Sequence, residues 1–203
     1  MVPKRIVAIG ASSCFGRVDL TGGGFVERLK KWHQITDENA VFNLGIDGDT
    51  TTDVLKRFLP EVAIRKPDLI LINIGLNDSR RMATQDAPLT TPLDQFEKNL
   101  QQLFTEAKSL CDIIFVGVNP IDDTKTQPLT DPNGQDFYYA FTDVERYANQ
   151  TKAVCKKLHI PYLDIFNLLL KDPDKKYLYK DGLHCNDAGH EKIFEELKTF
   201  LLQ

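Results

Sequence analysis

The chain has 203 residues, with 25 Lys or Arg against 29 Asp or Glu and a formal net charge of −4. This length predicts a single domain over residues 1–203 that can bury a sizeable hydrophobic core. Hydrophobic residues at 42% and charged residues at 27% are typical of a globular protein and exclude a disordered chain. A chain with this weakly negative net charge lacks the basic surface that nucleic-acid binding requires, so we expect no nucleic-acid partner.

The hydrophobic runs are too short for a membrane segment. LILINIGL at 69–76 is well below the roughly 20 residues of a membrane helix, so we expect no membrane span. The run IVAIGA that follows Lys4 and Arg5 is shorter than the roughly 7–15 residues of a signal peptide core. We therefore expect a cytoplasmic protein.

The four cysteines are far apart in the sequence and form no C-x-x-C pair. They are Cys14, Cys111, Cys155 and Cys185. Such spacing argues against a structural zinc site, and in a chain of this size it favours reduced thiols over a disulfide framework.

Five hydrophobic runs without polar alternation predict strands that are buried on both faces. In chain order they lie at 5–9, 40–44, 69–74, 113–118 and 160–163. Between them, hydrophobic residues recur at helical spacing over 93–110, 144–158 and 193–201, and Asp187 is the expected N-cap of the last helix. This alternation predicts a three-layer α/β/α sandwich with a flavodoxin-like, doubly wound, five-stranded parallel sheet in the order 2-1-3-4-5.

Two connections, at 79–92 and 119–136, are longer than ordinary loops of a compact domain. Such loops are often functional, although plain surface excursions explain them equally well. In and beside them, candidate substrate contacts are Arg80, Arg81, Tyr138, Tyr139 and Phe141, each of which could equally be a packing or surface residue.

Residue types that can take part in catalysis follow the predicted strands. In α/β sheets of this kind, ligands bind beyond the carboxyl ends of the strands. The segments found there are GASSCFG at 10–16, NLGIDGDT at 43–50, GLND at 75–78 and, after the last strand, DGLH at 181–184. A serine, a glycine, an amide and a histidine with a nearby carboxylate are therefore expected along one edge of the sheet.

These residue types suit acyl transfer. A serine hydroxyl becomes a nucleophile when a histidine such as His184 takes its proton, and Asp181 is close enough in sequence to orient that imidazole. A backbone N–H group at a glycine and a side-chain amide are candidate donors to the oxyanion of a tetrahedral intermediate.

The four segments together resemble the conserved blocks of the SGNH hydrolase superfamily, also called the GDSL esterase/lipase family. They occur in the family's order and span nearly the whole chain. The resemblance implies that Ser12 is the nucleophile, that Asp181 and His184 complete a triad, and that Gly48 and Asn77 join Ser12 in the oxyanion hole. It implies the SGNH form of the predicted fold and requires no cofactor or metal.

One position departs from the family pattern. The family's Asp before the nucleophile is Ala11 in this chain. That Asp is not a triad member in the family but helps to hold the nucleophile turn, so its absence leaves open a less active enzyme or a turn braced by Ser13 or Asp49.

Other readings of the same residues are less favoured. Ser12, Asn77 and Gly48 could be ordinary turn residues, and Cys14 could be a thiol nucleophile. A metal site built from His184, Asp187 and His190 matches no zinc signature, so we expect none.

The sequence thus predicts a serine hydrolase that cleaves carboxylic esters through an acyl-enzyme. The expected partner is a small-molecule ester, and no obligate protein partner is evident. The alternatives are an acyltransferase that uses the same acyl-enzyme and, because of Ala11, a binding module that has lost activity. The sequence does not identify the acyl or alcohol part of the substrate.

Overall fold

The computed structural model describes residues 3–34, 36 and 38–203. Its main sheet has five parallel strands in the order β2-β1-β3-β5-β8. They are β1 (Arg5–Gly10), β2 (Ala40–Gly45), β3 (Leu69–Asn73), β5 (Asp112–Val116) and β8 (Tyr162–Leu163). Counted along the chain these are the first to fifth strands of that sheet, so the predicted order 2-1-3-4-5 is confirmed.

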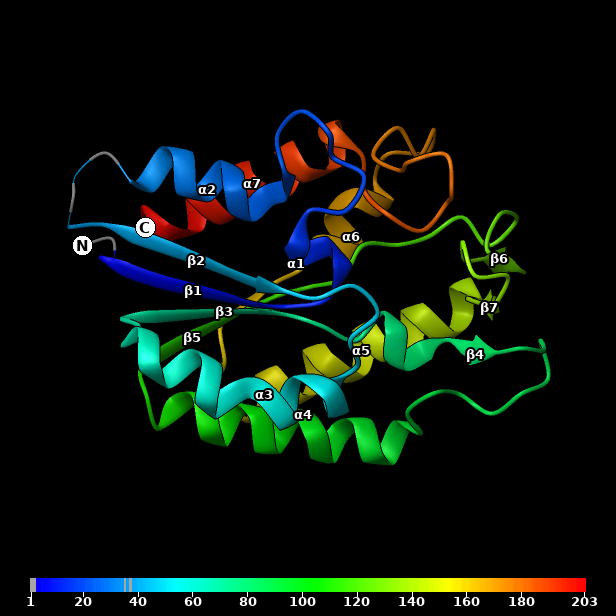
Figure 1. The fold of residues 1–203 in the computed structure, drawn as a ribbon, viewed down its shortest axis with the longest axis horizontal. Coiled ribbons are helices and arrows are strands. Elements are labelled where there is room, and N and C mark those ends of the chain that lie inside the picture. The colour runs from blue at the N-terminus through cyan, green and yellow to red at the C-terminus, as the bar shows by residue number, and fades with distance from the viewer. Residues whose placement is uncertain (1–2, 35, 37) are drawn as a thin grey trace.

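Helices cover both faces of this sheet (Figure 1). One face carries α1 (Ser12–Phe15), α2 (Gly24–His33), α6 (Ile165–Leu170) and α7 (Asp187–Leu201). The other carries α3 (Thr51–Val62), α4 (Leu93–Lys108) and α5 (Phe141–Lys157). Two short 3₁₀ helices, η1 (Ala63–Arg65) and η2 (Asn77–Ser79), follow α3 and β3. The predicted α/β/α sandwich is therefore confirmed.

Among residues 3–34, 36 and 38–203, no helix is long and hydrophobic enough to cross a membrane.

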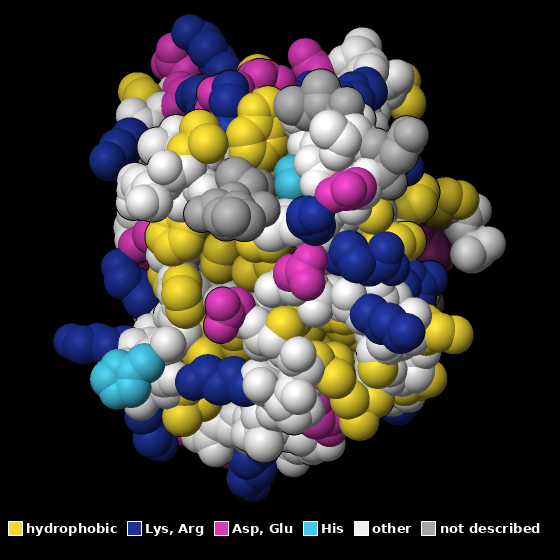
Figure 2. Space-filling model, turned by 90° about the vertical axis from the view of Figure 1, so that its left-hand side faces the viewer, with side chains coloured by type: hydrophobic (Ala, Val, Ile, Leu, Met, Phe, Trp, Pro, Cys, Tyr) yellow, Lys and Arg dark blue, Asp and Glu magenta, His cyan; other side chains and the backbone are white. Residues whose placement is uncertain are grey.

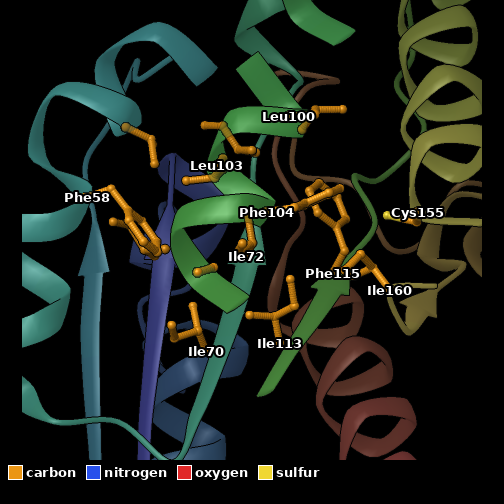
Figure 3. Close-up of a cluster of buried hydrophobic side chains, with 14 of the residues drawn as sticks. Phe58, Ile70, Ile72, Leu100, Leu103, Phe104, Ile113, Phe115, Cys155 and Ile160 are labelled. Carbon is orange, nitrogen blue, oxygen red and sulfur yellow. The ribbon is translucent and has the colours of Figure 1, made fainter. Parts of the chain in front are cut away.

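The strands are hydrophobic throughout because each one supplies both cores. Successive side chains point to opposite faces of a strand. On β3, Ile70 and Ile72 pack toward α3, α4 and α5, whereas Leu71 packs toward α2 and α7. Figure 3 shows the first of these clusters, in which Phe104 of α4 lies against Phe115 of β5 with ring centroids 5.9 Å apart.

The predicted N-cap of the last helix is wrong by one residue. The side chain of Asn186 accepts a hydrogen bond from the Gly189 N–H at 3.0 Å, and its backbone is extended, as a cap requires. Asp187 is instead the first helical residue and forms an ion pair with Arg28 of α2. Two neighbouring polar residues can both cap a helix, and the sequence alone does not decide between them.

The two long connections form a second, smaller sheet that the sequence analysis did not predict. It contains β4 (Arg81–Met82), β6 (Leu129–Thr130) and β7 (Asp136–Tyr138), which pair antiparallel in the order β4-β7-β6. A third hydrophobic cluster, which includes Tyr139 and Leu183, packs beneath it. Figure 1 shows this sheet beyond the carboxyl ends of the main strands. The connections are therefore ordered parts of the fold at its chemically interesting edge.

Candidate active site

Ser12 lies at a sharp turn where β1 ends and α1 begins. The turn passes so close to β3 that a Cβ placed on Gly10 would lie 2.0 Å from the carbonyl oxygen of Asn73. Only glycine tolerates such an approach. The turn exposes 7% of Ser12 at the carboxyl edge of the sheet.

Ser12, His184 and Asp181 form a continuous chain of hydrogen bonds. The Ser12 Oγ lies 3.1 Å from the His184 Nε2, and the His184 Nδ1 lies 2.7 Å from the Asp181 Oδ2. Because a carboxylate can only accept, Nδ1 carries the ring proton, and Nε2 is left to accept from the serine hydroxyl. This tautomer is the one in which a histidine can act as a general base toward Ser12.

Asp181 is held by its own turn. Its Oδ1 accepts from the backbone N–H groups of Leu183 and His184 at 2.9 and 3.0 Å, while Oδ2 faces the imidazole. Burial alone would raise the pKa of Asp181, but the hydrogen bonds from the ring and the backbone of His184 and from Leu183 outweigh it and lower the pKa. The carboxylate is therefore ionised at neutral pH and can stabilise an imidazolium.

Two donor groups lie at the same edge. Gly48 has φ = +83°, while a Cβ there would meet no atom within 4 Å, so the backbone conformation rather than space requires glycine. The Asn77 Nδ2 donates one hydrogen to the Asp49 carbonyl at 2.9 Å, which leaves its second hydrogen for a ligand. The sequence-predicted residues are thus brought to one place.

A hollow of about 750 Å³ contains these groups. Its lining residues are Ser12, Arg17, Val18, Asp47, Gly48, Asn77, Arg80, Leu129, Thr130, Asp131, Pro132, Phe137, Tyr139, Tyr179, Lys180, Asp181, Leu183 and His184. Of the five candidate substrate contacts, Arg80 and Tyr139 line it. A preformed hollow with a few convergent polar groups is the usual form of a small-molecule site.

The chain was compared with known proteins. The profile of the GDSL-like lipase/acylhydrolase family matches residues 8–192. The chain belongs to this family.

Two relatives of the chain have names that describe esterases. The acetylxylan esterase of Geobacillus stearothermophilus is 28% identical over 158 residues, which are 74% of this chain and 66% of that protein. The isoamyl acetate-hydrolyzing esterase of Schizosaccharomyces pombe is 26% identical over 200 residues, which are 96% of this chain and 73% of that protein. The chain thus spans just under two thirds of the first relative's length.

Two solved structures have folds similar to that of this chain. A lipase/acylhydrolase from Enterococcus faecalis superposes with a TM-score of 0.78 at 26% identity, covering 98% of this chain and 95% of that one. The acetylxylan esterase from Geobacillus stearothermophilus superposes with a TM-score of 0.75 at 23% identity, covering 98% and 94%. At 23% identity, the similarity to the acetylxylan esterase structure supports the fold alone.

The family's missing carboxylate at Ala11 is accommodated by packing. Ala11 is 6% exposed and belongs to the hydrophobic cluster beneath α3 and α4. The turn is braced instead by Arg57 of α3, whose Nη2 donates to the carbonyls of Gly10 and Leu44 at 3.2 and 2.9 Å. Its Nε donates to Asp49 at 2.8 Å. Arg57 therefore ties the ends of β1 and β2 to the Gly48 loop, a role that the sequence analysis missed.

Ser13 and Asp49 were the residues expected to replace that carboxylate. Ser13 donates a hydrogen bond to the Asn119 Oδ1 at 3.4 Å, and the Asn119 Nδ2 donates to the Leu183 carbonyl at 2.9 Å, next to His184. Asp49 reaches the turn through Arg57. Both residues thus support the site indirectly, through a partner side chain.

Asp78 supports the site from below. It is fully buried, and its carboxylate accepts from the N–H and the hydroxyl of Thr51, the first residue of α3. Burial raises the pKa of Asp78 against the opposing effect of these bonds. The contact joins the Asn77 segment to the helix that follows the Gly48 loop.

The two cysteines that adjoin the site in sequence point away from it. Cys14 and Cys185 are at most 1% exposed and belong to the core beneath α2 and α7. Burial raises the pKa of Cys14 to about 12 and also raises that of Cys185, so both remain protonated thiols. The alternative in which Cys14 is the nucleophile is therefore inconsistent with its position.

Within 3–34, 36 and 38–203, no group of three or more His, Cys, Asp or Glu side chains is arranged to hold a metal ion.

Proposed function

We propose that this chain is a serine esterase in which Ser12, His184 and Asp181 form the catalytic triad. The observation that carries the proposal is the hydrogen-bond chain from Asp181 through both ring nitrogens of His184 to the Ser12 hydroxyl. The family to which the chain belongs adds support, because the relatives reported above are named as esterases.

In the first half of the reaction, the Ser12 Oγ attacks the ester carbonyl while the His184 Nε2 takes the hydroxyl proton. The ionised Asp181 stabilises the imidazolium that results. His184 then gives its proton to the leaving alcohol, and an acyl-enzyme remains on Ser12. Water repeats the sequence with the same base, releases the acid and restores the serine.

The oxyanion of each tetrahedral intermediate is held by the N–H groups of Ser12 and Gly48 and by the free hydrogen of Asn77 Nδ2. These donors carry no net charge and are fixed before the substrate arrives. Each such donor typically contributes about 3–4 kcal/mol to lowering the barrier.

The substrate is an ester of a short acyl group, with acetate as the first candidate. Two relatives have names that refer to acetyl esters, an acetylated xylan in one case and isoamyl acetate in the other. The rim of the hollow carries charged side chains, including Arg17, Asp47 and Lys180, which suit a hydroxylated alcohol better than a long hydrocarbon chain.

The test uses p-nitrophenyl acetate and a fluorophosphonate probe. Ser12→Ala should lower kcat/KM by about 10⁴-fold or more and abolish labelling. Ser109→Ala, the same change at an exposed serine directly after α4, should retain labelling and activity. An unchanged rate in Ser12→Ala would refute the proposal.

A panel of p-nitrophenyl esters from acetate to octanoate tests the acyl preference. We expect kcat/KM to be highest for acetate, and a maximum at octanoate would contradict the short-acyl assignment. Adding a polyol acceptor and measuring transfer products in the same assay tests for acyltransferase activity.

A further inference from the structure

Two residues beside the small sheet lie behind the oxyanion donors. The Tyr139 hydroxyl donates to the Asn77 Oδ1 at 2.8 Å. The Arg80 guanidinium donates to the same oxygen from Nη1 and to the Gly48 carbonyl from Nη2, both at 3.4 Å. Arg80 directly precedes β4, and Tyr139 directly follows β7. Tyr139 therefore contacts the oxygen of the Asn77 amide, and Arg80 contacts that oxygen and the Gly48 carbonyl.

These contacts select one orientation of the Asn77 amide. A guanidinium can only donate, so it requires an oxygen at the amide end that it touches. The other end then carries Nδ2, which meets the Asp49 carbonyl at 2.9 Å. A flipped amide would place an NH₂ group against Arg80 and an oxygen against the Asp49 carbonyl, and both contacts would be repulsive. The orientation that exposes a donor to the substrate is thus the one that the surroundings stabilise.

Both residues are themselves held in place. Tyr139 is 2% exposed, and its backbone exchanges hydrogen bonds with Thr126, from Tyr139 N–H to the Thr126 carbonyl at 2.9 Å and from the Thr126 hydroxyl to the Tyr139 carbonyl at 2.8 Å. The Arg80 guanidinium lies over the ring of Phe137 in β7, 4.9 Å from its centroid. Burial raises the pKa of Tyr139, which keeps the hydroxyl protonated as a donor.

We propose that Tyr139 and Arg80 are positioning residues for the oxyanion hole, and that the small sheet serves to deliver them. Tyr139 fixes the rotation of the Asn77 amide. Arg80 bridges Asn77 and Gly48 and so sets the spacing of the two donors. Neither residue needs to touch the substrate. The inference rests on the esterase function proposed above.

The decisive test is a double-mutant cycle with Tyr139→Phe and Asn77→Ala. Alone, Tyr139→Phe should lower kcat about tenfold with little change in KM, because it removes one hydrogen bond and keeps the ring in place. In the Asn77→Ala background the same substitution should change kcat less than twofold. Equal effects of Tyr139→Phe in both backgrounds would overturn the proposal, because its effect would then not pass through Asn77.

Tyr138→Phe is the matched control. Tyr138 is the neighbouring residue of β7, is half-buried and does not line the hollow. It should retain the wild-type kcat, and thermal unfolding of all variants will show that the fold is preserved. A tenfold loss in Tyr138→Phe would assign the effect to the sheet as a whole and contradict the specific role of Tyr139.

Arg80→Lys tests the bridge. A lysine keeps the charge but cannot reach two acceptors with a planar fork. We expect kcat to fall about as far in Arg80→Lys as in Arg80→Ala, whereas full retention of kcat by Arg80→Lys would show that only the charge matters.

For variants whose kcat is too low to measure, the affinity for an inhibitor replaces the activity assay. Phenylboronic acid forms a tetrahedral adduct on an activated serine, and its affinity should repeat the pattern of the cycle. Failure of the esterase proposal is distinguishable, because activity would then survive Ser12→Ala. Failure of this inference would instead leave a Ser12-dependent enzyme with an additive cycle.

Discussion

The main sheet has a hollow at each of its two ends. The hollow at the carboxyl ends of the strands has a volume of about 750 Å³ and contains Ser12 and His184. The hollow at the amino ends is larger, about 1030 Å³, and is lined by residues that include Asp68, Ile113 and Phe200. Figure 2 views the molecule from this second end, where hydrophobic side chains gather among charged ones.

The two hollows differ in what their polar groups contact. At the amino end, Asp68 accepts from the Arg5 N–H at 2.8 Å, and Lys108 donates to the Leu158 carbonyl at 2.7 Å, so these groups tie the chain to itself. At the carboxyl end, the side chains of Asp181, His184 and Ser12 are hydrogen-bonded in series and line the hollow together with Asn77. The arrangement of polar groups, rather than the size of a hollow, therefore distinguishes the candidate site.

The direction of the chain explains this difference. In a parallel sheet all strands deliver their carboxyl ends to one edge, where helices begin and present unpaired N–H groups. Helices α1 and α3 begin at Ser12 and Thr51 on that edge. The Thr51 N–H is already paired with the Asp78 carboxylate and the Asp53 N–H with the Thr50 hydroxyl, so we expect the donors for a developing negative charge at the Ser12 turn and the Gly48 loop instead.

The largest expected effect comes from a pair of histidines, one at each end. His184→Asn removes the proposed base and should lower kcat/KM by about 10⁴-fold or more. His159 lines the amino-end hollow at φ = +53°, a conformation that asparagine tolerates well, so His159→Asn should retain activity. Comparable losses of kcat/KM in the two variants, measured on p-nitrophenyl acetate, would contradict the placing of the active site at the carboxyl end of the sheet.

A pair of arginines sharpens the comparison further. Arg57 binds the carbonyls of Gly10 and Leu44 at the carboxyl end, and Arg5 binds those of Arg65 and Lys66 at the amino end. Arg57→Ala removes the hydrogen bonds to these two carbonyls and leaves the Asp49 carboxylate without its ion-pair partner. This should cost about 2–4 kcal/mol of unfolding free energy and should lower kcat about tenfold by loosening the serine turn.

Arg5→Ala should lower the unfolding free energy and leave kcat unchanged. Urea unfolding and kcat, measured on both arginine variants, separate the two effects. A matching drop in kcat for Arg5→Ala would show that the loss at Arg57 is a general consequence of destabilisation.

The buried His190 should make the unfolding free energy depend on pH in mild acid. His190 of α7 is fully buried and stacks on Phe25 with ring centroids 6.3 Å apart. Burial, together with the positive charge of Arg28 and against the opposing charge of Asp19, lowers the pKa of His190 to about 4 from its usual 6.5.

The unfolded chain therefore binds one more proton than the folded chain between about pH 4 and 6.5. His190 thus makes the unfolding free energy fall as the pH drops through this window, by a total of about 3 kcal/mol. In His190→Leu this part of the decline should be absent, as urea titrations at pH 7 and pH 5 will show. A pH dependence identical to that of the wild type would contradict the assignment.

The main sheet could be predicted because each strand and each long helix has a local hydrophobic pattern. The proposed triad residues could be placed at one edge because parallel strands deliver their carboxyl ends to the same edge. Helix α3 carries a local signal of another kind, a capping box between Thr50 and Asp53. Helix α2 has no side-chain cap and begins after Gly23, so its start carries no comparable signal.

The small sheet could not be predicted in the same way. Its strands have two or three residues, and Arg81 pairs with Tyr138, which lies 57 positions later. Such pairing depends on contacts that only the folded chain makes. The same holds for Tyr139 and Arg57, whose partners at the site are far away in sequence.

The smallest expected effect comes from the thiols and returns to the two ends of the sheet. Cys14, Cys155 and Cys185 are buried, whereas Cys111 is half-buried and lines the amino-end hollow. Burial, with the nearby carboxylates of Asp112 and Asp68, raises the pKa of Cys111 to about 11, so its reaction with a maleimide should be slow but detectable. Because this thiol lies at the end opposite Ser12, complete modification should leave kcat/KM unchanged.

Mass spectrometry should find the label in the wild type and not in Cys111→Ser. Inactivation that also occurs in Cys111→Ser would mean that a thiol beside the triad is accessible, contrary to the buried positions of Cys14 and Cys185.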